Sequence, residues 1–138
     1  MEKVDHKREI ASYSARQGRF DIITVPPLQY LMIDGHGDPN ASESYRAALE
    51  TLFPVSYKLK LLSKRELGRD YTVMPLEALW WADDMSAFTS HTDKAAWQST
   101  VLLMLPAWID DAIETDLAPI VRFARTLNRD IDAVRNAI

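Results

Sequence analysis

Apolar residues along the chain alternate between strand-like and helix-like spacings. The succession of these spacings predicts the order strand, strand, helix, strand, strand, helix. Residues 1–18 are polar with no clear period and are expected to be a lead-in segment. β-rich runs at 20–25 and 28–33 follow, separated by two prolines that cannot continue a central ladder. Residues 34–40 hold two glycines, a proline and Asx residues, which together predict a loop.

A long helix is predicted after this loop, with Asn40 or Ser42 as its N-cap and Gly68 as its stop. Pro54 lies inside the helical pattern and is expected to kink the helix or split it in two. The apolar residues at helical spacing are Tyr45, Ala48, Leu49, Leu52, Phe53, Val55, Leu59 and Leu62.

The segment 71–82 is interpreted as one extended strand, in which alternate side chains take opposite faces. One face would carry Tyr71, Val73, Pro75, Glu77, Leu79 and Trp81, and the other Thr72, Met74, Leu76, Ala78 and Trp80. Both sets are largely apolar, so we expect this strand to be covered on both sides, with a bulge or bend at Pro75. Residues 97–105 predict its hairpin partner, and Pro106 suits the first turn of a helix.

Helical spacing returns at 108–113 and, after a break at Pro119, at 120–138. Hairpins with helices segregated from them predict an α+β fold: an antiparallel sheet of about four strands with helices packed on one face. The length of 138 residues suits one domain, and we expect residues 1–138 to form it.

The composition narrows the class of protein. The absence of cysteine excludes disulfides and thiolate chemistry and fits a reducing cytoplasm. A formal net charge of −4 argues against a nucleic-acid partner, which calls for a basic surface. The apolar run 101–106 is too short to span a bilayer, and the charged N-terminus lacks a signal core. We therefore expect a soluble cytoplasmic protein with no membrane partner. One basic cluster is interpreted as a solvated helix face: Lys58, Lys60, Lys64, Arg65 and Arg69.

Glu77 is the single acid on its predicted strand face, and it is the first candidate for chemistry. Desolvation of a carboxylate favours its neutral form and suits general acid–base work. The same charge could instead hold a cationic ligand, with Trp80 or Trp81 adding cation–π attraction. The structural alternative is a glutamate on an edge strand that faces water or pairs with an arginine.

The pair Trp80–Trp81 points its two rings to opposite faces of a strand, so one ring can anchor the core while the other lines a groove. Trp97 and Trp108 add two more rings. Aromatic walls suit flat apolar ligands, although core packing explains such rings equally well.

The run Asp34, His36, Asp38 has alternating metal-ligand types but lacks a well-spaced third or fourth partner. Loop-forming Asx chemistry explains the aspartates better. His91 and Asp93 lie in the other predicted loop, and no metal site is predicted there either. We predict no metal site and no cofactor, since no nucleotide-binding glycine motif or nucleophile elbow is present.

Three stretches together resemble one branch of the GyrI-like superfamily of small-molecule-binding domains. They are PLQYLMIDGHGDPN at 27–40, YTVMPLEALWW at 71–81 and LMLPAW at 103–108. The first two are the more specific, and the likeness runs from about Val4 to the end of the chain. The resemblance implies a β-α-β-β module, normally duplicated around a pseudo-twofold axis with a ligand groove between the halves.

Relatives of this kind are ligand-sensing domains of multidrug-responsive regulators or stand-alone binders, and some hydrolyse cyclopropane-bearing DNA alkylators. By this resemblance Glu77 is the expected catalytic residue, and Tyr71, Trp80 and Trp81 are expected to line the groove around it. Stand-alone relatives continue into a second module, whereas this chain ends at Ile138 in what resembles the connecting helix. Half of the groove is therefore expected to come from elsewhere.

Three functions follow as alternatives: a binding module for apolar or cationic aromatic compounds, a hydrolase of strained electrophiles, and an interaction subunit that uses an exposed sheet edge. We expect a homodimer, because twofold pairing would cover the apolar sheet and restore the missing half of the groove.

Overall fold

The computed structural model describes residues 2–89 and 92–114, and the predicted helix at 120–138 lies outside them. The strands are β1 (Lys3–Val4), β2 (Gln29–His36), β3 (Asp70–Tyr71), β4 (Glu77–Trp81) and β5 (Gln98–Leu105). The helices are α1 (His6–Glu9), α2 (Glu43–Leu62) and α3 (Ala107–Glu114). Short helical turns occupy Ala11–Tyr13, Ser63–Leu67, Met85–Phe88 and Lys94–Ala96.

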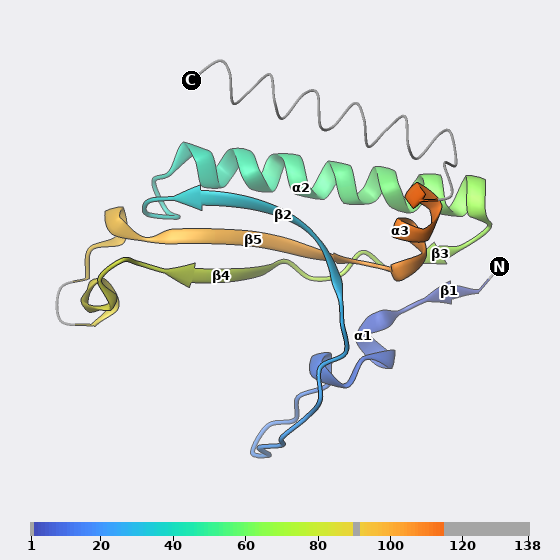
Figure 1. Cartoon of the computed structure of the whole chain (residues 1–138), viewed down its shortest axis with the longest axis horizontal. Helices are drawn as coiled ribbons and strands as arrows, with labels where there is room; N and C mark the ends of the chain where they lie inside the picture. The colour runs from blue at the N-terminus through green and yellow to red at the C-terminus, as the bar shows by residue number, and fades with distance from the viewer. Residues whose placement is uncertain (1, 90–91, 115–138) are drawn as a thin grey trace.

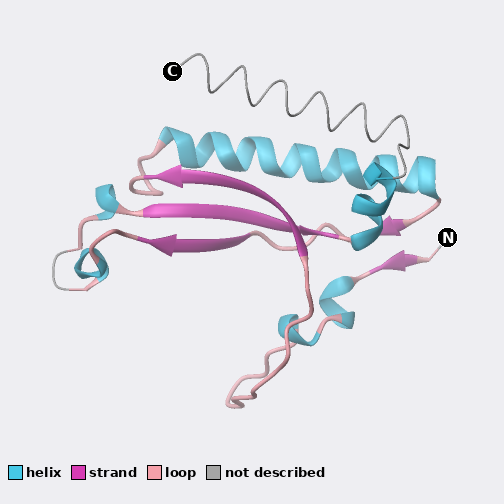
Figure 2. Ribbon diagram, in the orientation of Figure 1, coloured by secondary structure: helices cyan, strands magenta, loops and turns pink. Residues whose placement is uncertain are grey.

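The main sheet has three antiparallel strands in the order β2-β5-β4, with α2 running along one side of it (Figures 1 and 2). The strand β5 is central: Leu31 pairs with Leu103, and Ala78 pairs with Val101 on its other side. The hairpin predicted from 97–105 is confirmed as the pair β4–β5. The chain has an α+β fold with an antiparallel sheet, as predicted, with three strands in this sheet rather than about four.

The helix α2 begins where Ser42 accepts a hydrogen bond from the amide of Tyr45, 3.3 Å away. Gly68, in the left-handed conformation, ends the helical turn that follows it, as predicted. Pro54 does not split the helix, contrary to one of the two expected outcomes. The side chains that α2 buries recur every three or four residues and are Ala48, Leu52, Val55, Ser56, Leu59 and Leu62.

Two clusters make up most of the core. In the first, Ala48 and Leu52 of α2 pack on Val101 and Leu103 of β5. In the second, the other half of α2 packs with α3 and with a parallel two-stranded ribbon formed by β1 and β3. The side chains at its centre are Val55, Leu59, Tyr71 and Ile109.

The prediction of one strand over 71–82 is wrong, because the extended backbone is interrupted between β3 and β4. Pro75 lies in this interval and cannot donate a ladder hydrogen bond, which accounts for part of the break. The residues before it pair with the N-terminal segment instead: the amide of Thr72 donates to the carbonyl of Val4 over 2.8 Å. The lead-in segment is therefore partly ordered by β1.

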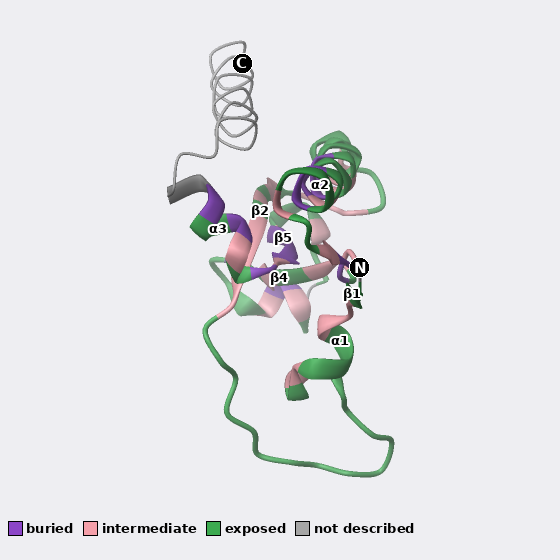
Figure 3. Ribbon diagram, turned by 90° about the vertical axis from the view of Figure 1, so that its right-hand side faces the viewer, coloured by how far each residue is buried: buried purple, intermediate pink, exposed green. Residues whose placement is uncertain are grey.

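The predicted strand at 20–25 is also absent, because no neighbouring strand pairs with it in the described chain. These residues belong to an exposed loop that extends away from the sheet and helices in both views (Figures 1 and 3). The predicted loop at 34–40 begins later than expected, since β2 continues to His36. Gly37 then turns the chain with a φ of 97°, a conformation that favours glycine.

The basic cluster is not simply a solvated face. Lys60 forms an ion pair with Asp70, and both side chains are largely buried. Lys64 adds a second contact to the same carboxylate at 3.6 Å. Together they anchor β3 to the end of α2 and hold the pKa of Asp70 below its usual range, first through the hydrogen bond from Lys60. Within the described residues, no helix is both long and apolar enough to cross a membrane.

We predict that Asp70→Asn destabilises the fold at neutral pH. The Asp70 carboxyl has a lowered pKa in the folded state, so its stabilising effect is present above about pH 4, the usual aspartate range. That effect is lost as the pH falls through the lower folded-state pKa. Thermal unfolding of both proteins should therefore show a gap at pH 7 that narrows in acid. Asp21→Asn, which removes only an exposed pair with Arg19, should change little. A gap that widens in acid would contradict this account.

Candidate functional site

One side of the sheet carries no long helix in the described part of the chain. Directly paired residues point to the same side, so the side chains opposite α2 follow from the strand register. We call this side the open face, and it consists of Tyr30, Met32, Asp34, His36, Glu77, Leu79, Trp81, Gln98, Thr100, Leu102 and Met104. Leu102 and Met104 lie on the central strand and are buried, whereas the side chains on the two outer strands are half-buried or exposed.

A hydrogen-bonded chain of three side chains crosses one end of the open face. Tyr13, from the turn that follows α1, donates its hydroxyl proton to Oε1 of Glu77. The hydroxyl oxygens of Tyr13 and Tyr30 lie 3.5 Å apart. Burial raises the pKa of the Tyr13 phenol above its usual range, and the hydrogen bonds to Glu77 and Tyr30 add to this. Tyr13 therefore acts as a donor to the carboxylate.

Exposed apolar side chains share the open face with this carboxylate, and Leu79 is the next residue of β4 on the same side. Met32 is 58% exposed, Leu79 61% and Trp81 40%. A second acid, Asp34, lies on the same face and accepts a hydrogen bond from Thr100 over 2.6 Å. The open face thus combines exposed apolar area with two carboxylates, each fixed by a hydroxyl donor.

The structure brings together only two of the four predicted site residues. Glu77 and Trp81 share the open face, at the two ends of β4. Trp80 points to the opposite side, where its ring lies 5.8 Å from Tyr45 of α2 and 5.8 Å from Trp97. Tyr71 is 1% exposed and belongs to the second core cluster, because the break after β3 separates it from β4.

The remaining tryptophans also serve the core. Trp97 stacks on Phe88 with ring centres 4.6 Å apart, and its indole donates to the carbonyl of Ala87. Trp108 packs edge-on against Tyr71 and donates to Ser63 over 2.9 Å. Core packing therefore explains three of the four tryptophans, and Trp81 is the exposed one. Trp108 also lines a second cavity of about 250 Å³, at the other end of the molecule from β4 (Figure 1), with Leu67, Arg69, Asp111 and Ala112.

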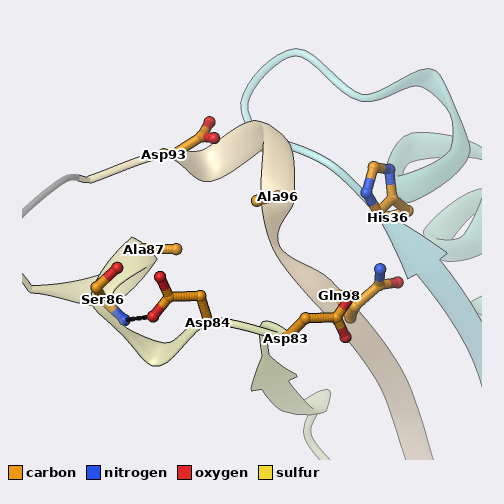
Figure 4. Close-up of a pocket in the computed structure, with 8 residues that line it drawn as sticks. All are labelled: His36, Asp83, Asp84, Ser86, Ala87, Asp93, Ala96 and Gln98. Atoms are coloured by element: carbon orange, nitrogen blue, oxygen red, sulfur yellow. Dashed lines mark hydrogen bonds between the residues drawn. The ribbon is translucent and has the colours of Figure 1, made fainter.

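A cavity of about 380 Å³ lies at the far end of the sheet (Figure 4). It is lined by His36, Asp83, Asp84, Ser86, Ala87, Asp93, Ala96 and Gln98. Asp84 and Asp93 hydrogen-bond to the local backbone as helix caps, and so does Asp38 in its own turn. Within the described residues no three acids or histidines are grouped to hold a metal ion, and His91 lies outside those residues.

The chemistry of the site centres on the carboxylate of Glu77. The phenol of Tyr13 occupies Oε1, so Oε2 can accept a further hydrogen bond or attract a cation. Sequence reasoning identified Glu77 but missed Tyr13, which lies 64 residues earlier in a segment without periodicity. Tertiary contacts bring that segment to the sheet: β1 pairs with β3, and the His6 ring lies 5.4 Å from the Trp108 ring.

Three solved structures from Listeria innocua are similar to this chain. An uncharacterised conserved protein is 29% identical with a TM-score of 0.70, and the match covers 93% of this chain and 59% of that one. A protein named a hydrolase is 32% identical with a TM-score of 0.66, covering 94% and 62% respectively. A further hydrolase is 29% identical with a TM-score of 0.65, covering 93% and 60%.

This chain therefore spans about 60% of the length of the structures that it matches. No family model matches the sequence, and no curated protein matches it.

We predict that Tyr13→Phe removes a phenol that ionises above about pH 10, the usual tyrosine value. In a spectrophotometric titration, the wild-type and variant curves should coincide up to that pH and separate only above it. Glu77→Gln should move this late ionisation to lower pH, because the acceptor loses its negative charge. Circular dichroism defines the pH range in which the fold is intact. If the Tyr13→Phe curve fell below the wild-type curve already below about pH 10, Tyr13 would not be the buried donor to Glu77.

Proposed function

We propose that the open face binds small apolar or cationic aromatic compounds, with Glu77 as the charged group of the site. One observation carries the proposal: a tethered carboxylate lies on the same strand face as an exposed tryptophan, with exposed Leu79 between them. A carboxylate in such surroundings is expected to favour a positively charged ligand over a neutral one.

The two side chains have separate roles in this proposal. Trp81 offers a flat apolar surface, which attracts an aromatic ring or a cation above its face. Glu77 supplies charge, and the hydrogen bond from Tyr13 restricts the carboxylate to one orientation. A ligand then meets a site whose polar group needs little rearrangement, which lowers the entropic cost of binding.

The sequence resemblance supports the same class of function. The stretch that contains Glu77 and Trp81 is one of the three that resemble GyrI-like small-molecule-binding domains, and we infer membership of that superfamily. The resemblance also implied ligand contacts for Tyr71 and Trp80, but the geometry does not favour them. Tyr71 packs in the core, and Trp80 packs against Tyr45 of α2. They are better candidates for supporting the fold of the site.

Hydrolysis is the second candidate function, favoured by the two similar structures that are named hydrolases. In this reaction Glu77 would accept a proton from water while the water oxygen bonds to an electrophilic carbon of the ligand. The electron pair of the breaking bond stays with the leaving atom, which then receives the proton. Tyr13 would hold the carboxylate in position.

For the binding function, we predict that Glu77→Gln weakens an aromatic quaternary ammonium dye by about 1.5–3 kcal/mol, the scale of a charge-assisted hydrogen bond. This corresponds to more than tenfold in Kd. An uncharged isostere of the dye should bind almost unchanged, whereas Trp81→Ala should weaken both. Met85→Ala, at an exposed apolar residue away from the open face, is the matched control. The Kd values are measured by calorimetric titration. If Glu77→Gln changed the Kd of neither compound, Glu77 would not belong to the binding site.

For the hydrolase function, we predict that Glu77→Gln lowers the turnover of a cyclopropane-bearing alkylator by roughly 10²-fold or more, as for loss of a general base. Binding of the intact compound should be mostly retained. Asp34→Asn is the matched control, because it removes the other carboxylate of the same face. Product formation is followed by mass spectrometry. Binding without any product in the wild-type protein would leave the binding function and exclude hydrolysis of that compound.

A further inference from the structure

The segment 14–28, which we call the arm, leaves the body of the protein between the turn at Ala11–Tyr13 and β2 (Figures 1 and 3). Its apolar side chains are unusually accessible: Phe20 and Ile22 are fully exposed, and Ile23 and Val25 are about half exposed. Soluble proteins normally cover an apolar run of this kind. The arm therefore has the character of a surface that contacts another molecule.

The arm also has the composition of a strand without a partner. Residues 20–25 are rich in β-branched and aromatic types, which favour the extended, half-buried environment of a sheet. Pro26 and Pro27 fix the backbone just before β2 and lack amide protons. They direct the arm away from its own sheet. The strand predicted from sequence at these residues can therefore form when a sheet edge from outside the chain is available.

The strand β4 offers such an edge. The strand β4 is the last in the order β2-β5-β4, so its outer backbone has no strand neighbour in the described chain. Leu79 and Trp81 of this strand are exposed apolar residues. Charge also matches: within the arm Arg19 pairs with Asp21, so Arg16 leaves the arm with a net positive charge, whereas the open face carries Asp34 and Glu77.

We propose that two copies of this chain exchange their arms, so that residues 20–25 of each copy add as a strand along β4 of the other. Such an exchange is twofold symmetric and closed. The exposed apolar side chains that lie along this pairing are Phe20, Ile22, Ile23 and Val25 of the arm and Leu79 and Trp81 of β4. The exchange covers this set twice, because each copy contributes both an arm and a β4 edge. One further consequence rests on the proposed function: the arm of the partner would form an apolar wall beside Trp81.

Sedimentation velocity tests the dimer without any ligand, so it is independent of the binding function. At about 10 µM, a concentration well above the Kd of a micromolar complex, the wild-type chain should sediment as a dimer. The variant Phe20→Ser/Ile22→Ser should sediment as a monomer, which at this concentration requires an increase in the dimer Kd of about a hundredfold or more. Both residues are fully exposed, so circular dichroism should be unchanged. Leu61→Ser, at an exposed leucine on α2, should remain dimeric.

Cross-linking tests the position of the arm. The chain contains no cysteine, so Ile22→Cys can carry a single benzophenone label. The labelled chain is mixed with ¹⁵N-labelled wild-type chain, irradiated and digested. We expect adducts between the arm and ¹⁵N peptides that contain 77–81. A monomeric wild-type chain, a dimer that survives the arm substitutions, a dimer lost in Leu61→Ser, or adducts confined to one chain or to another surface would each overturn the proposal.

Discussion

The helix α2 packs along one side of the three-stranded sheet, and this contact builds the core and positions the strands that carry the candidate site. Leu52 of α2 and Leu103 of β5 are both completely buried, and they meet near the middle of the sheet. Burying side chains of this size contributes about 1.5–3 kcal/mol each. A single long helix can cover only one side of the sheet. The same contact that builds the core therefore leaves the opposite side open, and the candidate site lies there.

The N-terminal segment supplies the hydroxyl group of Tyr13, which donates a hydrogen bond to Glu77 on this open side. The pairing of β1 with β3 fixes Val4 opposite Tyr71, and the chain then passes through α1 to the turn that carries Tyr13. The Lys60–Asp70 ion pair holds β3 against the end of α2, so the anchor of Tyr13 is itself tied to the main helix. The hydrogen bond that orients Glu77 comes from Tyr13, and the position of Tyr13 depends in turn on the β1–β3 pairing and the Lys60–Asp70 ion pair.

Sequence patterns predicted the elements whose side chains have strong periodicity. The helix that carries Leu52 and the pairing of β4 with β5 follow from the spacing of apolar residues, and the stop at Gly68 follows from the preference of glycine for the left-handed conformation at helix ends. Glu77 could be singled out because a lone acid in an apolar strand is unusual. Both faces of 71–82 are apolar, so alternation alone could not reveal that Tyr71 and Glu77 belong to different sheets.

Two features could not be predicted, because they arise from contacts between distant residues. Tyr13 lies in a segment without periodicity, and only its hydrogen bond to Glu77 marks its role. The run 20–25 has the composition of a strand, but composition does not specify a partner for it, and the described chain provides none. Local propensity therefore indicated what these residues can form, whereas the tertiary structure decides whether they form it.

Ligand binding on the open face near Glu77 can be measured directly in solution. Methionine methyl groups report on it, because Met32 and Met104 lie on this face, Met74 is buried, and Met85 lies exposed in the turn Met85–Phe88. A cationic aromatic compound is titrated into protein labelled with ¹³C at the methionine methyls, and carbon–proton spectra are recorded. Binding on the open face predicts shifts of Met32 and Met104, with Met74 and Met85 unchanged. Shifts confined to Met85, with Met32 and Met104 unchanged, would place the ligand away from the open face and contradict this prediction.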